Sequence, residues 1–354
     1  MSATAYNRNL NGLRGLCAFL VFVRHVWAGP RLEGWWGDAL PHAATWDFLF
    51  NSLQCAVEIF FMISGFLITA SLLRAPSVGH FLLNRVLRIY PVFLATHLVL
   101  FALGPALHYK LLDGVDAAEW SRLFATNILL LPGVFDLPLV QTNAWSLSYE
   151  AAFYGFAVIA AVLGRQLPRQ PQLIMVALAT AGICFLYPRA VFFAGGAVVY
   201  LLSERAVALG RSRWLAPALL LPLLFLLLQA SIEAAPAGMR LGYGLGFFLG
   251  IAVFAALVHG TGGVARFLAR RAMQYLGNIS YSFYLWHPFA YFAGKKIVRA
   301  FASGLPPLLQ LVLLFVIALP LALALSHVSW RLIERRATGL LRRRLQPQAL
   351  PSVA

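Results

Sequence analysis

Long runs of apolar residues recur along this chain. Each run is about 20 residues long, the length that a helix needs to cross a bilayer core of about 30 Å. The apolar positions are continuous and lack the alternation of a half-buried β-strand. The pattern therefore predicts an all-α, polytopic membrane protein with about ten transmembrane helices. We expect the spans near residues 10–29, 48–73, 89–107, 144–163, 172–187, 190–203, 214–230, 240–259, 273–293 and 305–328.

The charged residues are few, and basic and acidic residues fall mostly in alternate loops. Hydrophobic residues make up 61% of the chain and charged residues 11%, with a formal net charge of +16. Most Lys and Arg residues fall in segments that are cytoplasmic when the N-terminus is cytoplasmic, and most acids fall in the outer loops. This pattern predicts cytoplasmic termini at both ends and a multi-pass protein of the inner (cytoplasmic) membrane. The positive charge thus labels orientation in the lipid bilayer and indicates no nucleic-acid partner.

The chain shows one transmembrane domain, expected over residues 1–336, and a short basic cytoplasmic tail, 337–354. The longest extramembrane stretch, 108–143, contains the apolar segment SRLFATNILLLPG, which we expect to lie at the interface or to re-enter partway. Cysteines occur only within apolar spans and without paired spacing, and no two histidines are three or four residues apart. We therefore expect no disulfide framework and no metal site.

Arg14 and His25 lie eleven residues apart within the first span. Eleven helical steps of about 100° bring both side chains to one face, with roughly 16 Å between their heights. An arginine and a histidine in a membrane span are costly unless they face a partner or a wet cavity, which makes them candidates for a functional site. The alternative is that each side chain snorkels to the nearer interface.

Two carboxylates, Glu58 and Glu150, fall within the second and fourth spans. From their distances along the helices, we expect both at depths that His25 can meet from the first span. A buried acid beside a histidine fixes its tautomer and stabilises the imidazolium, as a general base requires. The alternative is a structural ion pair between spans.

Arg85 and Arg88 are three residues apart in the segment HFLLNRVLRIYPVF, which enters the membrane from the cytoplasm. They therefore share one helix face. Two guanidinium groups in this arrangement suit a phosphate-bearing cytosolic ligand. The alternative is that both are ordinary positive-inside anchors.

The ninth span carries a dense set of hydrogen-bonding groups for a lipid environment. Such groups serve helix–helix contacts as readily as a site. The set comprises Asn278, Ser280, Tyr281, Ser282, Tyr284 and His287.

Six segments taken together resemble the acyltransferase-3 family of integral membrane acyltransferases. They occur in the family's order and extend from residue 9 to about residue 336. The segments are NLNGLRGLCAFLVFVRH, VEIFFMISGFLIT, RVLRIYPVF, WSLSYEAAFYGF, LGNISYSFYLWHPF and WRLIERR.

The resemblance implies a helical membrane enzyme that transfers an acyl group, usually acetyl, from cytoplasmic acyl-CoA to a hydroxyl of a saccharide or glycoconjugate. It implies that His25 is catalytic together with Arg14, that Glu150 is the acid of the WSLS segment, and that Arg85 and Arg88 bind the donor. The other polar residues expected to support the site are Glu58, Ser64, Trp145, Ser148, Asn278, Tyr281 and His287.

This chain departs from the family's pattern at two positions. Ala151 stands where the family often has a second acid, which puts the role of Glu150 in doubt if that second acid carries the chemistry. Glu58 stands where the family more often has Asp, which keeps the charge but moves it by about one methylene group.

We expect acyl-CoA to be a substrate, with no bound cofactor. His25, oriented by Glu150 or Glu58, would take the proton from the acceptor hydroxyl as that hydroxyl attacks the thioester, and Arg14 would hold the donor or stabilise the oxyanion. A covalent acyl-histidine relay is the variant mechanism. The alternative class of function is a transporter or flippase with a relay of intramembrane charges, which predicts inverted repeats that the chain does not show.

Overall fold

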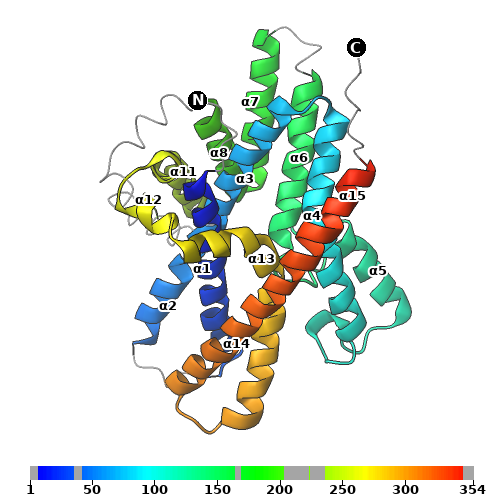
Figure 1. Ribbon diagram of the computed structural model, residues 1–354, viewed down its shortest axis with the longest axis vertical. Coiled ribbons are helices and arrows are strands. Elements are labelled where there is room, and N and C mark those ends of the chain that lie inside the picture. Colours follow the sequence, from blue (N-terminus) through cyan, green and yellow to red (C-terminus); the bar gives the residue numbers. More distant parts are fainter. Residues whose placement is uncertain (1–6, 36–41, 164–168, 203–222, 224–235, 346–354) are drawn as a thin grey trace.

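Every regular element of the computed structural model is helical within the residues that it describes, which are 7–35, 42–163, 169–202, 223 and 236–345 (Figure 1). In these residues β-type pairing is limited to one isolated bridge between Pro132 and Phe135. The prediction of an all-α protein is therefore confirmed for this part of the chain. The predicted span 214–230 lies, apart from Leu223, outside the described residues.

Helices occupy the positions of the other predicted spans. The helices at these positions are α1 (Arg8–Leu32), α2 (Ala43–Ser52), α3 (Cys55–Arg74), α4 (Val78–Leu103), α6 (Trp145–Leu163), α7 (Arg169–Leu186), α8 (Val191–Leu201), α11 (Pro236–His259), α13 (Arg271–Ala302) and α14 (Pro307–Ser329). The other described elements are η1 (Lys110–Leu112), α5 (Ala117–Ile128), η2 (Pro188–Ala190), α12 (Gly263–Leu268), the π-helical η3 (Trp330–Ala337) and α15 (Thr338–Leu345).

Four stretches of helix within the described residues are long and apolar enough to cross a membrane. They are Ala43–Arg74, Val78–Leu103, Trp145–Val162 and Pro307–Leu345. Polar and charged side chains on α1 and α13 lower the hydropathy of these two helices, which are not among the four. The apolar helices are those of a membrane protein, and the ten-span topology stays a prediction.

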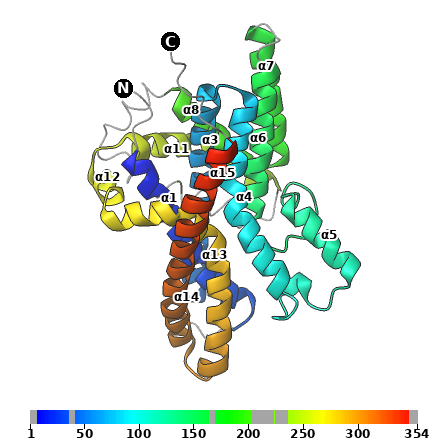
Figure 2. The ribbon, with the colours of Figure 1, turned by 45° about the vertical axis from the view of Figure 1, so that its right-hand side comes forward.

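Segments predicted to face opposite sides of the membrane lie toward opposite ends of the molecule. In Figure 1 the start of α1, the connection from α3 to α4 and the end of α15 lie in the upper half, whereas the connection from α13 to α14 lies at the bottom. Figure 2 shows α13 and α14 side by side and α5 set apart from them. This arrangement agrees with the predicted alternation of loops, and the cytoplasmic position of the termini stays a prediction.

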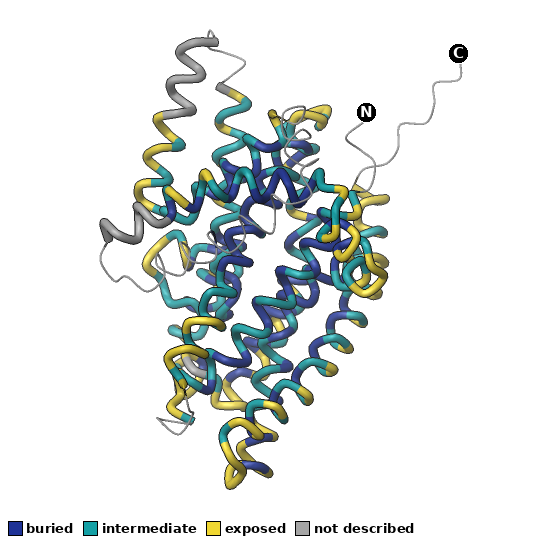
Figure 3. The backbone as a smooth tube through the Cα atoms, turned by 90° about the vertical axis from the view of Figure 1, so that its left-hand side faces the viewer, coloured by how far each residue is buried: buried dark blue, intermediate teal, exposed yellow. Residues whose placement is uncertain are grey.

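Close crossings at glycine residues bring the central helices together. A Cβ atom on Gly277 of α13 would lie 2.1 Å from the carbonyl oxygen of Asn11 on α1. A Cβ atom on Gly65 of α3 would lie 2.0 Å from the carbonyl oxygen of Phe193 on α8. Small residues at such crossings let backbones approach closely, as membrane helices require. Figure 3 shows the buried positions gathered along the centre of the molecule and the exposed ones at its ends and outer faces.

α13 changes direction partway along its length (Figures 1 and 2). Pro288 has no N–H to donate to the carbonyl of Tyr284, four residues earlier, and this carbonyl accepts a hydrogen bond from Asn143 Nδ2. The N–H of Ser282 donates to Glu334 Oε1 over 3.0 Å. Two side chains from distant segments thus satisfy backbone groups of α13, and they fix the position of its polar middle part.

Candidate active site

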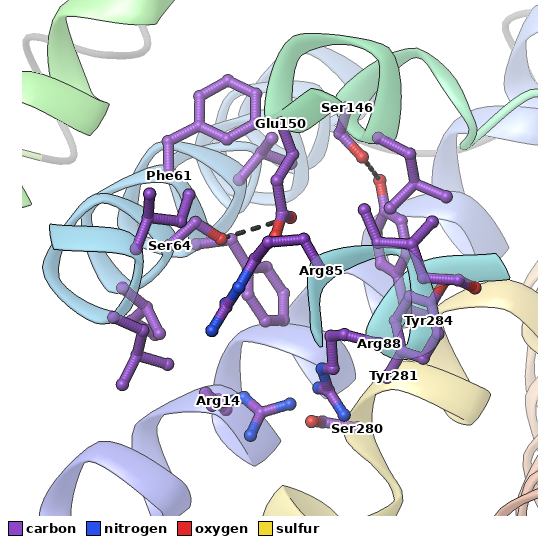
Figure 4. Close-up of a pocket in the computed structure, with 17 residues that line it drawn as sticks. Arg14, Phe61, Ser64, Arg85, Arg88, Ser146, Glu150, Ser280, Tyr281 and Tyr284 are labelled. Carbon is purple, nitrogen blue, oxygen red and sulfur yellow. Dashed lines mark hydrogen bonds between the residues drawn. The ribbon is translucent and has the colours of Figure 1, made fainter. Parts of the chain in front are cut away.

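One cavity collects six of the twelve predicted site residues. It has a volume of about 820 Å³, including its open mouth, and lies between α1, α3, α4, α6 and α13 (Figure 4). Along α3 its wall runs from Val57 to Ile68. These eleven helical steps correspond to about 16 Å at 1.5 Å per residue. The polar residues that line it are Arg14, Ser64, Arg85, Arg88, Ser146, Glu150, Ser280, Tyr281 and Tyr284.

Three arginines from two helices reach into this cavity. Figure 4 shows Arg14 from α1 and Arg85 and Arg88 from α4 pointing toward the same space. The guanidinium of Arg85 lies 5.5 Å from the ring centre of Phe81, and its buried Nε has no hydrogen-bond partner among the described residues. The guanidinium of Arg88 lies over the ring of Tyr281, 5.0 Å from its centre. The expectation that Arg85 and Arg88 share a face is met, since both line one cavity.

Glu150 is the carboxylate of this cavity. Its Oε2 accepts a hydrogen bond from Ser64 Oγ over 3.3 Å, and its Oε1 accepts one from the hydroxyl of Tyr154, one helical turn later. Both donors hold the carboxylate at the cavity wall, beside the arginines in Figure 4. The described site therefore combines three positive charges with one negative charge.

A second hollow adjoins the cavity and is rich in basic residues. It has a volume of about 1,060 Å³ including its open mouth. Leu67, Arg85 and Arg88 line both spaces, so the two hollows meet at these residues. We call the second hollow the basic vestibule. Its other charged or hydrogen-bonding side chains come from α3, α4 and α15: Ser71, Arg74, His80, Asn84 and Arg342.

His25 lies outside the wall of the cavity and faces a second histidine. His25 Nδ1 is 2.8 Å from the carbonyl oxygen of Val21 and 3.3 Å from Nε2 of His287. The ring of Tyr284 lies 6.0 Å from that of His287, and Tyr284 also lines the cavity. The hydroxyl of Tyr284 contacts Ser146 Oγ at 2.7 Å. The histidine pair is thus separated from the cavity by one aromatic ring.

Glu58 lies apart from the cavity, in a buried ion pair. Its Oε1 is 3.3 Å from Nε of Arg189, and its side chain is 3% exposed. Arg189 also donates to the hydroxyl of Tyr243 over 2.6 Å and lies over the ring of Trp145. This arrangement corresponds to the alternative of a structural ion pair. The partner, Arg189, lies in η2, and nothing in the sequence spacing indicates that it would meet Glu58.

The remaining predicted residues have structural contacts. Ser148 is buried, and its hydroxyl donates to the carbonyl of Ala144 over 3.4 Å. Asn278 accepts a hydrogen bond from Asn11 Nδ2 over 3.1 Å, close to the crossing of α1 and α13. Tyr281 lines the cavity, and its hydroxyl donates to the carbonyl of Ile89 over 2.6 Å.

Sequence reasoning missed Ser146, Tyr154 and Glu334 as residues of this region. Tyr154 had a signal, because it follows Glu150 by four residues, the spacing at which helical side chains meet. Glu334 lies in the quoted segment WRLIERR, as an acid among arginines. Ser146 had no local signal, since its partner Tyr284 is 138 residues away in the chain.

Comparison with known proteins agrees with the resemblance. The chain matches the model of the acyltransferase domain of the acyltransferase-3 family over residues 7–327. It is 29% identical over 165 residues to Nodulation protein 10 of Rhizobium leguminosarum bv. viciae, covering 43% of each chain. It is 32% identical over 155 residues to the acyltransferase MdmB of Streptomyces mycarofaciens, covering 41% of this chain and 37% of that protein.

These alignments cover less than half the length of either curated relative. No solved structure matches the chain. The family model, in contrast, covers most of the chain and includes the helices that build the cavity. The chain therefore belongs to the acyltransferase-3 family of membrane acyltransferases.

Proposed function

We propose that this protein is a membrane-bound O-acyltransferase that moves an acyl group, acetyl in the simplest case, from cytoplasmic acyl-CoA to a hydroxyl of a saccharide or glycoconjugate. The observation that carries the proposal is the cavity with three converging guanidinium groups, Arg14, Arg85 and Arg88, beside the basic vestibule. Family membership supports acyl transfer as the reaction.

The two hollows suit the two parts of acyl-CoA. The phosphate groups of CoA are anions, and arginine binds phosphate through paired, charge-assisted hydrogen bonds. Arg74, Arg85, Arg88 and Arg342 of the vestibule supply such donors. The pantetheine arm is narrow and mostly uncharged, and it would extend along the cavity wall of α3 toward Tyr284. Arg14 lies in this cavity, which favours a role in holding the donor over a role at the oxyanion.

The chemistry would take place at the Tyr284 end of the cavity, next to the histidine pair. His25 Nε2 takes the proton of the acceptor hydroxyl while the hydroxyl oxygen bonds to the thioester carbonyl carbon. Collapse of the tetrahedral intermediate breaks the C–S bond, and His25 returns the proton to the CoA thiolate. Such general-base catalysis typically contributes about 10²–10⁴ in rate. In the acyl-histidine variant, His25 itself carries the acyl group between donor and acceptor.

In this proposal Glu150 does not orient His25. It lies with the arginines, held by Ser64 and Tyr154. A carboxylate beside three guanidinium groups would offset part of their mutual repulsion while the donor is absent, as the ion pair with Glu334 does for Arg88. Its contribution is then to donor binding.

The first experiment is a turnover assay of the purified protein in lipid nanodiscs. CoA release from acetyl-CoA would be followed with a panel of saccharide acceptors, for the wild type, His25→Ala and His108→Ala. His108 is a suitable control because its side chain is 75% exposed and pairs with Asp113, five residues later in the chain. We expect acceptor-dependent release that His25→Ala abolishes and His108→Ala retains.

Donor binding tests the cavity separately from the chemistry. We expect the Kd of CoA to rise in Arg85→Ala and Arg88→Ala and to stay unchanged in Arg122→Ala, whose side chain is 48% exposed on α5. Equal turnover by the wild type and His25→Ala would remove His25 from the reaction. Absence of both CoA binding and turnover would contradict the proposed function and favour the transporter alternative.

A further inference from the structure

The contacts of His287 determine which of its ring nitrogens carries a proton. Its side chain is completely buried, and its Nδ1 lies 3.0 Å from the carbonyl oxygen of Phe283. A carbonyl oxygen only accepts hydrogen bonds, so Nδ1 must be the protonated nitrogen. In the uncharged ring, Nε2 then carries the lone pair and is an acceptor.

The same reasoning applies to His25 and gives a consistent pair. Nδ1 of His25 lies 2.8 Å from the carbonyl oxygen of Val21, so this nitrogen also carries a proton. The acceptor Nε2 of His287 lies 3.3 Å from the same Nδ1. The proton of His25 is therefore shared between two acceptors, one from α1 and one from α13. The basic lone pair of His25 is left on Nε2.

The surroundings of His287 hold its ring in this orientation. Its ring lies edge-on to Phe22 at 6.2 Å between centres and stacks on Phe283 at 6.1 Å. Tyr284, at 6.0 Å, separates it from the cavity. Pro288 follows directly in α13, where the freed carbonyl of Tyr284 accepts from Asn143. Rings and backbone contacts on several sides thus fix the histidine that faces His25.

We propose that His287 is a positioning residue that sets the tautomer of His25 and stabilises its protonated form. This inference rests on the proposed function, and it deepens the account of that site. His287 accepts the Nδ1–H of His25 and leaves Nε2 to take the proton of the acceptor hydroxyl. When His25 becomes an imidazolium, its Nδ1–H donates to His287 more strongly, because hydrogen bonds from charged donors are the stronger ones.

A neutral histidine takes the place that a carboxylate was expected to have. Glu150 lies with the arginines of the cavity, and Glu58 is paired with Arg189. The positive charge of protonated His25 would therefore be stabilised by two uncharged acceptors, His287 and the Val21 carbonyl. No charge transfer beyond His25 is needed, and the proton that His25 receives later returns to the thiolate.

Two conservative variants separate this role from a packing role. Gln places its amide near the position of the ring Nε2, so His287→Gln keeps an acceptor toward His25. Asn places its amide near the position of Nδ1, so His287→Asn keeps the contact with Phe283 and loses the acceptor. We expect His287→Asn to lower kcat about tenfold to a hundredfold with the KM for acetyl-CoA nearly unchanged. We expect His287→Gln to stay within about fivefold of the wild type.

An equal loss in both variants, or a loss in neither, would overturn the positioning role. Equal thermal unfolding midpoints of the two variants would exclude a folding defect as the cause. A fall in kcat together with a large rise in the KM for acetyl-CoA would assign His287 to donor binding instead.

Magic-angle-spinning NMR of protein labelled with ¹⁵N-histidine tests the pairing without any turnover. The chain has eight histidines, so few signals need assignment. We expect a ¹⁵N–¹⁵N correlation across the hydrogen bond between one protonated Nδ1 and one unprotonated Nε2, and its loss in both His25→Ala and His287→Gln. Absence of the correlation in an active wild type overturns this inference. Its presence in a wild type that turns over no acceptor overturns the proposed function and leaves the pairing established.

Discussion

Arg88 and Glu334 lie 246 residues apart in the chain and form an ion pair, with 3.3 Å between Nη1 and Oε2. The other carboxylate oxygen of Glu334 accepts from both the N–H and the hydroxyl of Ser282. One side chain in η3 therefore ties a donor-binding candidate on α4 to the middle of α13. The position of Arg88 in the cavity depends on a residue that lies outside it.

Two substitutions of Glu334 separate its two contacts. Glu334→Gln keeps an acceptor for Ser282 and removes the charge that faces Arg88, so we expect altered CoA affinity and little change in the free energy of unfolding. Glu334→Ala also removes the acceptor, and we expect a loss of about 1–3 kcal/mol of stability. CoA titration and reversible unfolding in mixed micelles measure the two effects. Identical behaviour of the two variants would contradict this division.

The paired arginines should not tolerate lysine. Arg85→Lys and Arg88→Lys keep the charge but lose the planar fork that binds phosphate through two parallel hydrogen bonds. We expect the Kd of CoA to rise about tenfold to a hundredfold in each variant, because one charge-assisted hydrogen bond is worth about 1.5–3 kcal/mol. Isothermal titration with CoA measures this, and Arg122→Lys on α5 is the matched control. Unchanged affinity in both cavity variants would show that charge alone is sufficient.

The crossing of α3 and α8 should be intolerant of a single methyl group. A Cβ atom on Gly65 would lie 2.0 Å from the Phe193 carbonyl oxygen, whereas a Cβ atom on Gly155 of α6 would meet no heavy atom within 4 Å. We expect Gly65→Ala to destabilise the protein by about 1–3 kcal/mol because the backbones must move apart. Gly155→Ala should be neutral or slightly stabilising. Comparing the unfolding of the two variants checks this; equal stability would mean that the crossing adjusts freely.

Removing only one partner of the buried pair Glu58 and Arg189 should strongly destabilise the protein. Removal of one partner leaves an uncompensated charge in the interior, and we expect Glu58→Ala to cost about 3–5 kcal/mol of stability. The double variant Glu58→Ala, Arg189→Ala should cost less than the sum of the single variants. The exposed pair of Glu119 and Arg122 provides the control cycle, and we expect a much smaller coupling there because solvent screens the two charges. Additive losses at Glu58 and Arg189 would show that the two side chains do not stabilise one another.

The sequence by itself determined the helical class, the positions of most helices and six of the nine polar residues that line the cavity. Apolar runs of about 20 residues encode spans locally, and hydrogen bonding within each helix satisfies the backbone wherever the helix lies. Spacing along one helix placed Arg85 and Arg88 on a shared face. The order of six motifs indicated the family, and the family match confirmed it.

Only the tertiary structure decided which polar side chains meet. Glu150 lies with the arginines, Glu58 with Arg189, and His25 with His287 on a helix 262 residues away. A helix fixes the direction of each side chain relative to its own axis but not its rotation or height against a neighbouring helix. Those depend on glycine crossings such as Gly15 with Gly277 and on the bend of α13, both of which arise from contacts between distant segments.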